Sequence, residues 1–400
     1  MKRTISFVMA VVMLAACFAF AGCSKSAGSN VIKIGMQGPY TGETAVYGLA
    51  VKNGAELYFN QVNANGGING KQIEVVSYDN KGDDAEAVNA FNRLVDGGIT
   101  AFLGDVLTGN TLAVVPEAYA INMPMITASA TAAAVTVNED DGTVYSNVFR
   151  SCFIDPFQGE KMATYAAERP TYAGGKLHPK TAAVIALTGD AYAAGLAEAF
   201  IAKCGELGVT VVASEGYAKG DKDFNAQLTN IMSKNPDVVF CPNYYEDDGM
   251  IITQARALGL DAMFLGGDGW GGVSDYASAE DLEGSLYCSA YAPESTDAVE
   301  AFEAAYMEAY GEPVPNMFAA LAYDAAAVLC AALTKAEESG AATGSDEYKQ
   351  AVIDAIRTEG PSVVGVTSAT GYTFDDSNNP IKDAVIMELV KGREVFKEIY

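Results

Sequence analysis

The segment FLGGDGWGG at residues 264–272 places one acid, Asp268, among five glycines and beside the chain's only tryptophan, Trp270. Glycine clusters often hold phosphate groups, because backbone N–H groups can approach the anion closely. A carboxylate in the middle of such a loop repels the anion that the loop would have to hold. The segment therefore argues against a nucleotide site and leaves open which group Asp268 faces.

Two other short segments combine a hydroxyl group with the start of an expected helix. Thr108-Gly109-Asn110 lies between an expected strand and an expected helix, and Ser129-Ala130-Thr131 is interpreted in the same way in the next unit. The first turn of a helix has unpaired N–H groups and favours negative charge, so a carboxylate is a natural ligand there. Alternatively, Thr108 and Thr131 simply cap their helices, and the residues alone leave both readings open.

The residues that most enzymes need are scarce. The single histidine, His178, lies in the connector GGKLHPK, where a solvent-facing loop residue is expected. The chain has no HExxH zinc site and no GxSxG nucleophile elbow. The acidic run YEDDG at 245–249 could hold a cation, but acids that complement a helix dipole explain it more simply. The sequence therefore predicts a protein that is not an enzyme, with no catalytic residues, no metal site and no cofactor.

Composition and charge narrow the class of partner. The chain has 400 residues, of which 50% are hydrophobic, and this is ample material for two cores. Its 25 basic and 51 acidic residues give a formal net charge of −26. This charge repels nucleic acid and anionic lipid headgroups, so neither is an expected partner.

The elements that must position these residues alternate regularly from residue 31 onward. The expected strands are VIKIGMQG, KQIEVVSYD, ITAFLGD, MPMITAS, TAAVIAL, VTVVASEGY, PDVVFCPN and AMFLGGD. The expected helices include 84–96, 110–121, 191–207, 223–234, 247–258, 297–310, 317–337 and 346–358, and a hairpin around LVKGREVF closes the chain. Two series of alternating strands and helices predict an α/β fold with two doubly wound parallel-sheet lobes.

Ligands of such sheets bind beyond the carboxyl ends of the strands. Six polar segments directly follow expected strands, three in each lobe, and they are the candidates for a site: 37–44, 105–110, 127–131, 188–192, 242–248 and 266–270.

The first 22 residues are typical of an export signal. Lys2 and Arg3 precede an uncharged apolar run that ends in FAGCSKSAGSN. The Ala21-Gly22-Cys23 ending resembles a lipobox, which makes Cys23 the expected lipidation site and 23–30 a flexible linker. Cys17 in LAAC is the alternative, although it would leave the apolar FAFAG on the mature protein, and an uncleaved membrane anchor is a third possibility. Each reading places the protein outside the cytoplasmic membrane.

The remaining cysteines are Cys152, Cys204, Cys241, Cys288 and Cys330. Five cysteines cannot all pair, and none forms a CxxC spacing. No disulfide framework is expected, since free thiols are common in apolar stretches such as those around Cys241 and Cys330.

The whole chain from residue 31 to 390 resembles the leucine/isoleucine/valine-type solute-binding proteins of ABC importers. The resemblance is carried by the opening IKIGMQGPYTGETAVYGLAVKNGAELYFNQVNANGGINGKQIEVVSYDN and then, in order, by NVFRSCFIDPFQGEKMATY, GDKDFNAQL, NPDVVF, QARALGL and FLGGDGW. It implies two similar lobes that three crossing segments join and that close on a ligand. Lobe 1 is expected from 31–149 with 291–365, and lobe 2 from 150–290 with 366–400.

The resemblance also implies where a free amino acid binds. Thr108 with the segment Ser129, Ala130 and Thr131 corresponds to the site of the α-carboxylate. The ammonium site corresponds to the Ser129 backbone, the Thr131 hydroxyl and Asp268, whose flanking glycines are expected to let backbone and ligand approach closely. The side-chain pocket corresponds to Tyr47, Tyr192, Tyr244 and Phe318. Core packing is the alternative for the tyrosines, of which the chain has 21.

The function implied is capture of an amino acid, branched-chain or another small aliphatic one, for delivery to an ABC permease by a monomeric lipoprotein. Relatives often have Glu where Asp268 stands, and the cysteine pair of some relatives is missing here. Two alternatives stay open: an amino-acid sensor that signals to a partner protein, and a binder of an amide, urea or aromatic acid on the same fold.

Overall fold

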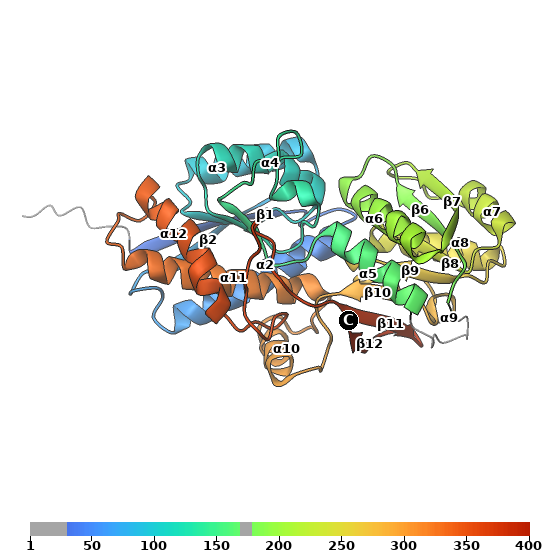
Figure 1. The fold of residues 1–400 in the computed structure, drawn as a ribbon. Helices are drawn as coiled ribbons and strands as arrows, with labels where there is room; N and C mark the ends of the chain where they lie inside the picture. The colour runs from blue at the N-terminus through green and yellow to red at the C-terminus, as the bar shows by residue number, and fades with distance from the viewer. Residues whose placement is uncertain (1–29, 169–177) are drawn as a thin grey trace, which may run out of the picture.

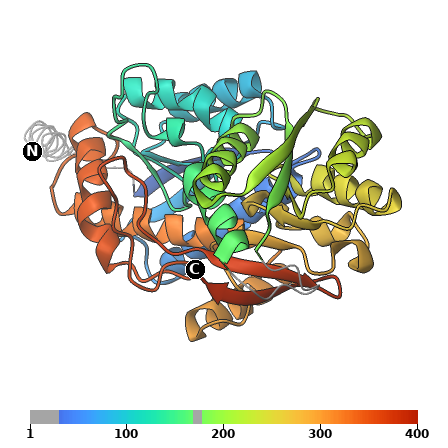
Figure 2. The same cartoon turned by 45° about the vertical axis from the view of Figure 1, so that its right-hand side comes forward.

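The computed structural model describes residues 30–168 and 178–400, which form two lobes side by side (Figures 1 and 2). The expected export signal and both candidate lipidation sites, Cys17 and Cys23, lie outside the described residues and stay predictions.

The first sheet has five parallel strands in the order β2-β1-β3-β4-β5. The strands are β1 (Val31–Gly38), β2 (Gln72–Asp79), β3 (Ala101–Leu103), β4 (Met125–Thr127) and β5 (Val148–Arg150). Its helices are α2 (Ala45–Ala64), α3 (Asp84–Asp96), α4 (Thr108–Ala120), α10 (Asp297–Tyr310), α11 (Met317–Glu337) and α12 (Asp346–Glu359). In β1, Ile32 and the continuous run from Ile34 to Gly38 are buried, as expected for a strand covered on both faces.

The second sheet has seven strands in the order β12-β11-β10-β9-β8-β6-β7. The strands are β6 (Thr181–Leu187), β7 (Thr210–Tyr217), β8 (Val238–Cys241), β9 (Met263–Gly266), β10 (Leu286–Ser289), β11 (Val385–Val390) and β12 (Arg393–Ile399). Its helices are α5 (Asp155–Glu168), α6 (Ala191–Leu207), α7 (Asn225–Lys234), α8 (Tyr245–Ala257) and α9 (Ala279–Leu282). The expected closing hairpin is β11–β12, and it adds two antiparallel strands to an otherwise parallel sheet.

The chain passes between the two sheets three times. The first crossing connects β5 to α5, the second leads from β10 to α10, and the third runs from the short helix η4 (Gly360–Ser362) to β11 (Figure 1). The expected α/β fold with two doubly wound lobes is therefore confirmed. The exact lobe boundaries stay a proposal.

Helix α11 is the longest described helix and forms the centre of the first lobe. It is the one described helix that is long and apolar enough to cross a membrane, but 83% of its apolar window is buried inside the protein. It packs against α2 and α12, and Gly54 of α2 permits this contact, because a Cβ there would lie 2.0 Å from the Ala319 carbonyl oxygen. Its apolar composition is that of a core helix.

The structure also contains elements that the sequence patterns did not predict. Strands β5 and β10 and helix α5 were not expected, and α4 begins at Thr108, two residues before the expected helix at 110–121. The boundaries of four expected helices, 84–96, 191–207, 297–310 and 317–337, agree with the structure.

Candidate ligand-binding site

A small pocket lies where residues from the two lobes meet. Its volume is about 20 Å³, and it is lined by Tyr47, Val106, Leu107, Thr108, Ser129, Tyr192, Tyr244, Asp268, Gly269 and Phe318. Seven of the nine residues predicted to contact a ligand are therefore brought together here. The other two, Ala130 and Thr131, are fully buried beside Ser129 but do not line the pocket.

Asp268 contributes a buried acid with a free acceptor. It is 1% exposed, and its Oδ2 has no hydrogen-bond partner among the described residues. Its backbone N–H donates to Gln158 Oε1 at 2.9 Å, and the N–H of Gly269 donates to Tyr192 Oη at 2.8 Å. Burial raises the pKa of Asp268 to about 6, and hydrogen bonds with the Tyr192 hydroxyl and the Gln158 side chain limit this rise. A carboxylate buried in this way gains from a cationic ligand, because its Oδ2 has no hydrogen-bond partner among the described residues to offset its desolvation.

The opposite wall carries the segments predicted to hold a carboxylate. The Ser129 hydroxyl donates to the Val106 carbonyl oxygen at 2.7 Å, and the N–H of Thr131 donates to Thr108 Oγ1 at 3.3 Å. Thr108 does not cap α4, since the N-cap position is Leu107 and has no side-chain cap. Thr108 belongs instead to the first helical turn, whose N–H groups lack partners within the helix.

The expectation that Ser129-Ala130-Thr131 also starts a helix is wrong. Only the three-residue 3₁₀ turn η1 (Ala133–Val135) follows, and its N-cap is Ala132. The extended backbone before it is held by Arg150, whose guanidinium donates to the carbonyl oxygens of Ala130 and Ala132, both at 2.9 Å. The segment therefore offers hydroxyl and backbone groups, but no α-helix dipole.

Four aromatic rings form the remaining wall. Tyr192 and Tyr244 are stacked with ring centroids 5.3 Å apart, and Tyr47 meets Phe318 edge to face at 5.0 Å. The Tyr244 hydroxyl donates to Asp190 Oδ2 at 3.1 Å. Because this hydroxyl has a partner outside the pocket, the ring can cover an apolar side chain.

Tyr47 also joins the two lobes. Its hydroxyl, from α2 of the first lobe, donates to the Gly269 carbonyl oxygen at 2.5 Å and accepts from the N–H of Tyr245 at 3.1 Å. The Tyr245 hydroxyl in turn donates to the Glu43 carbonyl oxygen at 2.5 Å. The pocket has about the room that one water molecule needs, so an amino acid can enter only when these contacts open.

The glycines around Asp268 let other segments of the protein pack closely against this loop. A Cβ on Gly266 would lie 2.1 Å from the Trp270 ring, one on Gly267 would lie 2.3 Å from Leu196, and one on Gly269 would lie 2.3 Å from the Asn243 carbonyl oxygen. They therefore allow the protein's own atoms to approach, and Gly269 also lines the pocket, so the expected close approach of a ligand stays a prediction. Trp270 is fully buried, donates from Nε1 to the Cys241 carbonyl oxygen at 2.9 Å and does not line the pocket.

Two polar residues near the pocket were not singled out in the sequence. Asp155 is fully buried and Gln158 lies one turn further along α5; the side-chain N of Gln158 and both carboxylate oxygens of Asp155 lack hydrogen-bond partners among the described residues. Burial raises the pKa of Asp155 well above its ordinary value, the Thr131 hydroxyl opposes the rise and the Asp268 charge adds to it. An acid after the buried run VFR was the available signal, since it marks another strand end.

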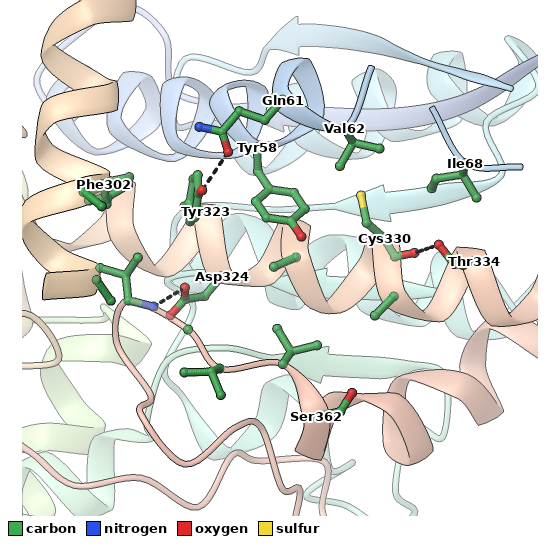
Figure 3. A pocket seen from close by; sticks show the side chains of 18 of the residues that line it. Tyr58, Gln61, Val62, Ile68, Phe302, Tyr323, Asp324, Cys330, Thr334 and Ser362 are labelled. Carbon is green, nitrogen blue, oxygen red and sulfur yellow. Dashed lines mark hydrogen bonds between the residues drawn. The ribbon is translucent and has the colours of Figure 1, made fainter. Parts of the chain in front are cut away.

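Two larger hollows lie outside this pocket. A cleft of about 540 Å³ between the lobes shares Leu107 and Tyr244 with it and forms its outer side. A groove of about 800 Å³ lies between α2, α10 and α11, where Tyr58, Tyr323 and Cys330 face it (Figure 3). The groove contains none of the residues predicted to contact a ligand, and the carboxylate of Asp324 beside it accepts bonds from Val366, Thr367 and Tyr372.

The other candidate groups have local partners. His178 is exposed, and its Nδ1 lies 2.7 Å from the Ala167 carbonyl oxygen. In the run YEDDG, Glu246 pairs with Lys222 at 2.9 Å and Asp247 accepts from the Tyr217 hydroxyl at 2.9 Å. Within residues 30–168 and 178–400, all five cysteines are buried and unpaired, and no group of His, Cys, Asp and Glu is placed to hold a metal ion.

A family model described as periplasmic binding protein matches residues 31–394. The chain belongs to this family. Its members are solute-binding proteins of transporters, and membership implies a location outside the cytoplasmic membrane.

Named relatives of this periplasmic binding protein bind branched-chain amino acids. It is 32% identical over 341 residues to the Leu/Ile/Val-binding protein BraC3 of Rhizobium johnstonii, covering 84% of this chain and 86% of the relative. It is 32% identical over 332 residues to the leucine-, isoleucine-, valine-, threonine- and alanine-binding protein of Pseudomonas aeruginosa, covering 82% and 84%. The crystal structure of the branched-chain amino acid transporter substrate-binding protein LivJ from Streptococcus pneumoniae with isoleucine matches with a TM-score of 0.80 and 32% identity, covering 92% and 99%. The resemblance seen in the sequence is confirmed.

Proposed function

We propose that this periplasmic binding protein captures a free aliphatic amino acid between its two lobes and delivers it to an ABC permease. The observation that carries the proposal is the buried Asp268 carboxylate, which has an unpaired oxygen opposite the hydroxyl-bearing segments of the other lobe. A free amino acid is a zwitterion, so a site that excludes water must satisfy both of its charges.

Each lobe supplies a partner for one charge. Asp268 faces the ammonium group from the second lobe, while Thr108 and Ser129 face the carboxylate from the first lobe. A ligand that bridges the lobes binds the closed form better than the open form and therefore favours closure. The aromatic wall then covers the ligand side chain, and the names of the relatives support a branched or other small aliphatic one.

Export and anchoring complete the proposed function. We propose that Cys23 carries a lipid that holds the monomeric protein at the outer face of the cytoplasmic membrane. The signal-like first 22 residues and the Ser/Gly-rich segment after Cys23 support this. Mass spectrometry of protein from a membrane fraction would find a lipid mass on Cys23, and a Cys23→Ser variant would be released.

A thermal-shift screen of the common amino acids tests the proposed ligand class. At about 100 times its dissociation constant, a ligand adds about 2.7 kcal/mol to the free energy of unfolding, which raises the melting temperature measurably. We expect leucine, isoleucine or valine to give the largest shifts. Shifts produced by amides, urea or benzoate, with none from amino acids, would reject the proposal in favour of a ligand without an ammonium group.

A further inference from the structure

Asp105 is a buried acid that lies outside the pocket. It follows one strand and is hydrogen-bonded to residues at the ends of three others. It follows β3 and is 0% exposed. Its Oδ2 accepts from Gln37 Nε2 at the end of β1 and from Asn80 Nδ2 after β2, both at 2.7 Å, and its Oδ1 accepts from the N–H of Val106 at 2.5 Å. Its carbonyl oxygen accepts from Thr127 Oγ1, in β4, at 2.7 Å. One residue thus fixes the positions of β1, β2, β3 and β4 at the ligand edge of the sheet.

The groups bonded to Asp105 are in turn bonded to the pocket wall. The Val106 carbonyl oxygen accepts from the Ser129 hydroxyl at 2.7 Å, and Thr127 Oγ1 accepts from the N–H of Ala130 at 3.2 Å. Val106, Thr108 and Ser129 line the pocket, whereas Asp105 does not. Both segments of the proposed carboxylate site are therefore connected to Asp105 through a single intervening residue.

The bonding pattern fits the ionised form of this carboxyl group. Three donors point at its two oxygens, and a carboxylate has only acceptors to offer. Burial raises the pKa of Asp105 to about 7, and the bonds from Gln37, Val106 and Asn80 oppose the rise, while the Asp84 charge adds to it. Burial and then the charge of Asp105 raise the pKa of Tyr40, whose buried hydroxyl has no hydrogen-bond partner among the described residues.

We propose that Asp105 is a positioning residue that sets the carboxylate end of the binding site, by fixing Val106–Thr108 against Ser129–Thr131. The proposal rests on the proposed amino-acid function and deepens it, because it assigns to a residue outside the pocket the preference for a ligand with a free carboxylate. A neutral side chain of the same shape cannot accept all three donors, so the two segments shift relative to each other. Recognition of the ligand's ammonium group by Asp268 should then be the same as in the wild type.

The test compares leucine with leucinamide, which keeps the ammonium group and the side chain but lacks the carboxylate. Dissociation constants for both are measured by calorimetry with the wild type and with Asp105→Asn. We expect the variant to bind leucine at least about tenfold more weakly, the effect of roughly 1.4 kcal/mol. The affinity of the variant for leucinamide should change by less than about threefold, which corresponds to less than about 1 kcal/mol of binding free energy.

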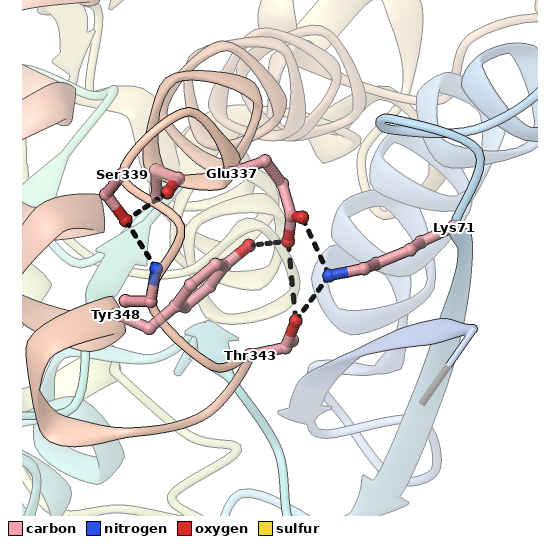
Figure 4. Close-up of polar contacts among 7 residues, drawn as sticks. Lys71, Glu337, Ser339, Thr343 and Tyr348 are labelled. Carbon is pink, nitrogen blue, oxygen red and sulfur yellow. Dashed lines mark hydrogen bonds and ion pairs between the residues drawn. The ribbon is translucent and has the colours of Figure 1, made fainter. Parts of the chain in front are cut away.

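Glu337→Gln is the matched control. Glu337 is a partly buried acid of the same lobe that accepts from Lys71 Nζ at 2.7 Å and from the Tyr348 hydroxyl at 2.7 Å (Figure 4). It lies at the far end of α11 from Phe318, roughly 28 Å away by the rise of the helix. We expect this variant to lose thermal stability while the ratio of the leucine and leucinamide affinities stays that of the wild type.

The outcomes separate this inference from the proposed function. Equal losses for the two ligands in Asp105→Asn, or no loss for either, would overturn the positioning role while leaving the amino-acid function intact. A wild type that binds neither leucine nor any other amino acid would overturn the proposed function itself. If circular dichroism shows that Asp105→Asn does not fold, Gln37→Met removes one of the three donors and must show the same selective loss for leucine.

Discussion

Asp268 owes its proposed role to its surroundings rather than to its residue type. Among the described residues, Asp268 is a buried acid, 1% exposed, with a carboxylate oxygen that has no hydrogen-bond partner. Asp155 lies close by, since the charge of Asp268 adds to the rise that burial causes in the pKa of Asp155. Such a site gains the most from a ligand that brings positive charge.

Replacing Asp268 by Asn should weaken amino-acid binding by about 2–5 kcal/mol, because the ligand's buried ammonium group loses its charged partner. Isothermal titration calorimetry measures this loss directly. Asp275→Asn, an exposed acid seven residues further along, is the control and should bind as the wild type does. Unchanged affinity in Asp268→Asn would remove Asp268 from the site.

The same carboxyl group should make binding depend on pH. The pKa of Asp268 is raised to about 6 in the structure described here, and a bound ammonium group would lower it, so binding requires loss of the proton below that pH. Affinity should therefore be constant above pH 7 and fall as the pH decreases, by about tenfold at pH 5. Calorimetric titrations between pH 5 and pH 8 check this. A flat profile, or an affinity that rises toward pH 5, would contradict it.

At this scale the sequence predicted most of the pocket but not the residues behind it. Thr108, Asp268 and the aromatic residues follow strands or stand in recognisable segments, so their positions could be inferred from the resemblance. Asp155 and Gln158 could not, because α5 and the strand before it carry no clear periodic pattern. The glycine contacts with Trp270 and Leu196 depend on packing between distant segments, which spacing along the chain does not report.

The segment after β9 shows how an element holds the acid in place. Gly266 and Gly267 let the backbone pass directly over Trp270 and Leu196, and the 3₁₀ turn η2 (Asp268–Trp270) then directs Asp268 toward the first lobe. The N–H groups of Asp268 and Gly269 are fixed by Gln158 and Tyr192. The orientation of the acid therefore depends on packing within the second lobe.

Replacing Gly266 by Ala should destabilise the protein by about 1–3 kcal/mol, because the new Cβ would lie 2.1 Å from the buried Trp270 ring. Urea denaturation monitored by tryptophan fluorescence measures the free energy of unfolding. Gly205→Ala in α6 is the matched control: its Cβ meets no atom within 4 Å, and alanine should stabilise the helix by about 0.5–1 kcal/mol. A neutral Gly266→Ala would show that Trp270 does not pack as described.

Long helices with apolar periodicity were predicted well, and so were the short strands β3, β4, β8 and β9, whereas β5 and β10 were not. The sequence around α6, α10 and α11 carries both the periodic pattern and clear ends, such as Asn316 capping α11 and Gly311 ending α10. Strands β5 and β10 contain three and four residues, too few to establish a pattern alone, and unlike the equally short β3 and β4 they were not recognised within longer apolar runs such as ITAFLGD and MPMITAS. They form because neighbouring strands of the sheet supply hydrogen-bond partners. These neighbours are set by the tertiary structure and not by the local sequence.

In the whole molecule, three crossings connect the lobes, and contacts across the pocket hold the lobes together. Tyr47 makes two of these contacts, to Gly269 and Tyr245, and Tyr245 makes a third to Glu43. Closure therefore does not depend on the ligand alone. The balance between the open and closed forms sets the apparent affinity, because a ligand must supply any free energy of closure that these contacts do not.

Replacing Tyr47 by Phe should shift this balance toward the open form. It removes two hydrogen bonds, each of which contributes about 0.5–1.5 kcal/mol. Small-angle X-ray scattering of the ligand-free variant should show a larger radius of gyration than that of the wild type, and saturating amino acid should reduce it. Tyr58→Phe, on the same helix but facing the groove of Figure 3, is the control and should leave the radius unchanged. Equal radii for the two variants would show that Tyr47 does not govern closure.

The central claim is that one zwitterion is shared by the two lobes, with its ammonium group on Asp268 and its carboxylate on Thr108 and Ser129. A crystal structure of the protein grown with leucine, or with whichever amino acid gives the largest thermal shift, tests it most directly. The account predicts the ligand nitrogen within about 3 Å of Asp268 Oδ2 and the ligand carboxylate against the first lobe. A bound amino acid whose nitrogen lies elsewhere, with the Asp268 carboxyl group turned toward solvent, would contradict it.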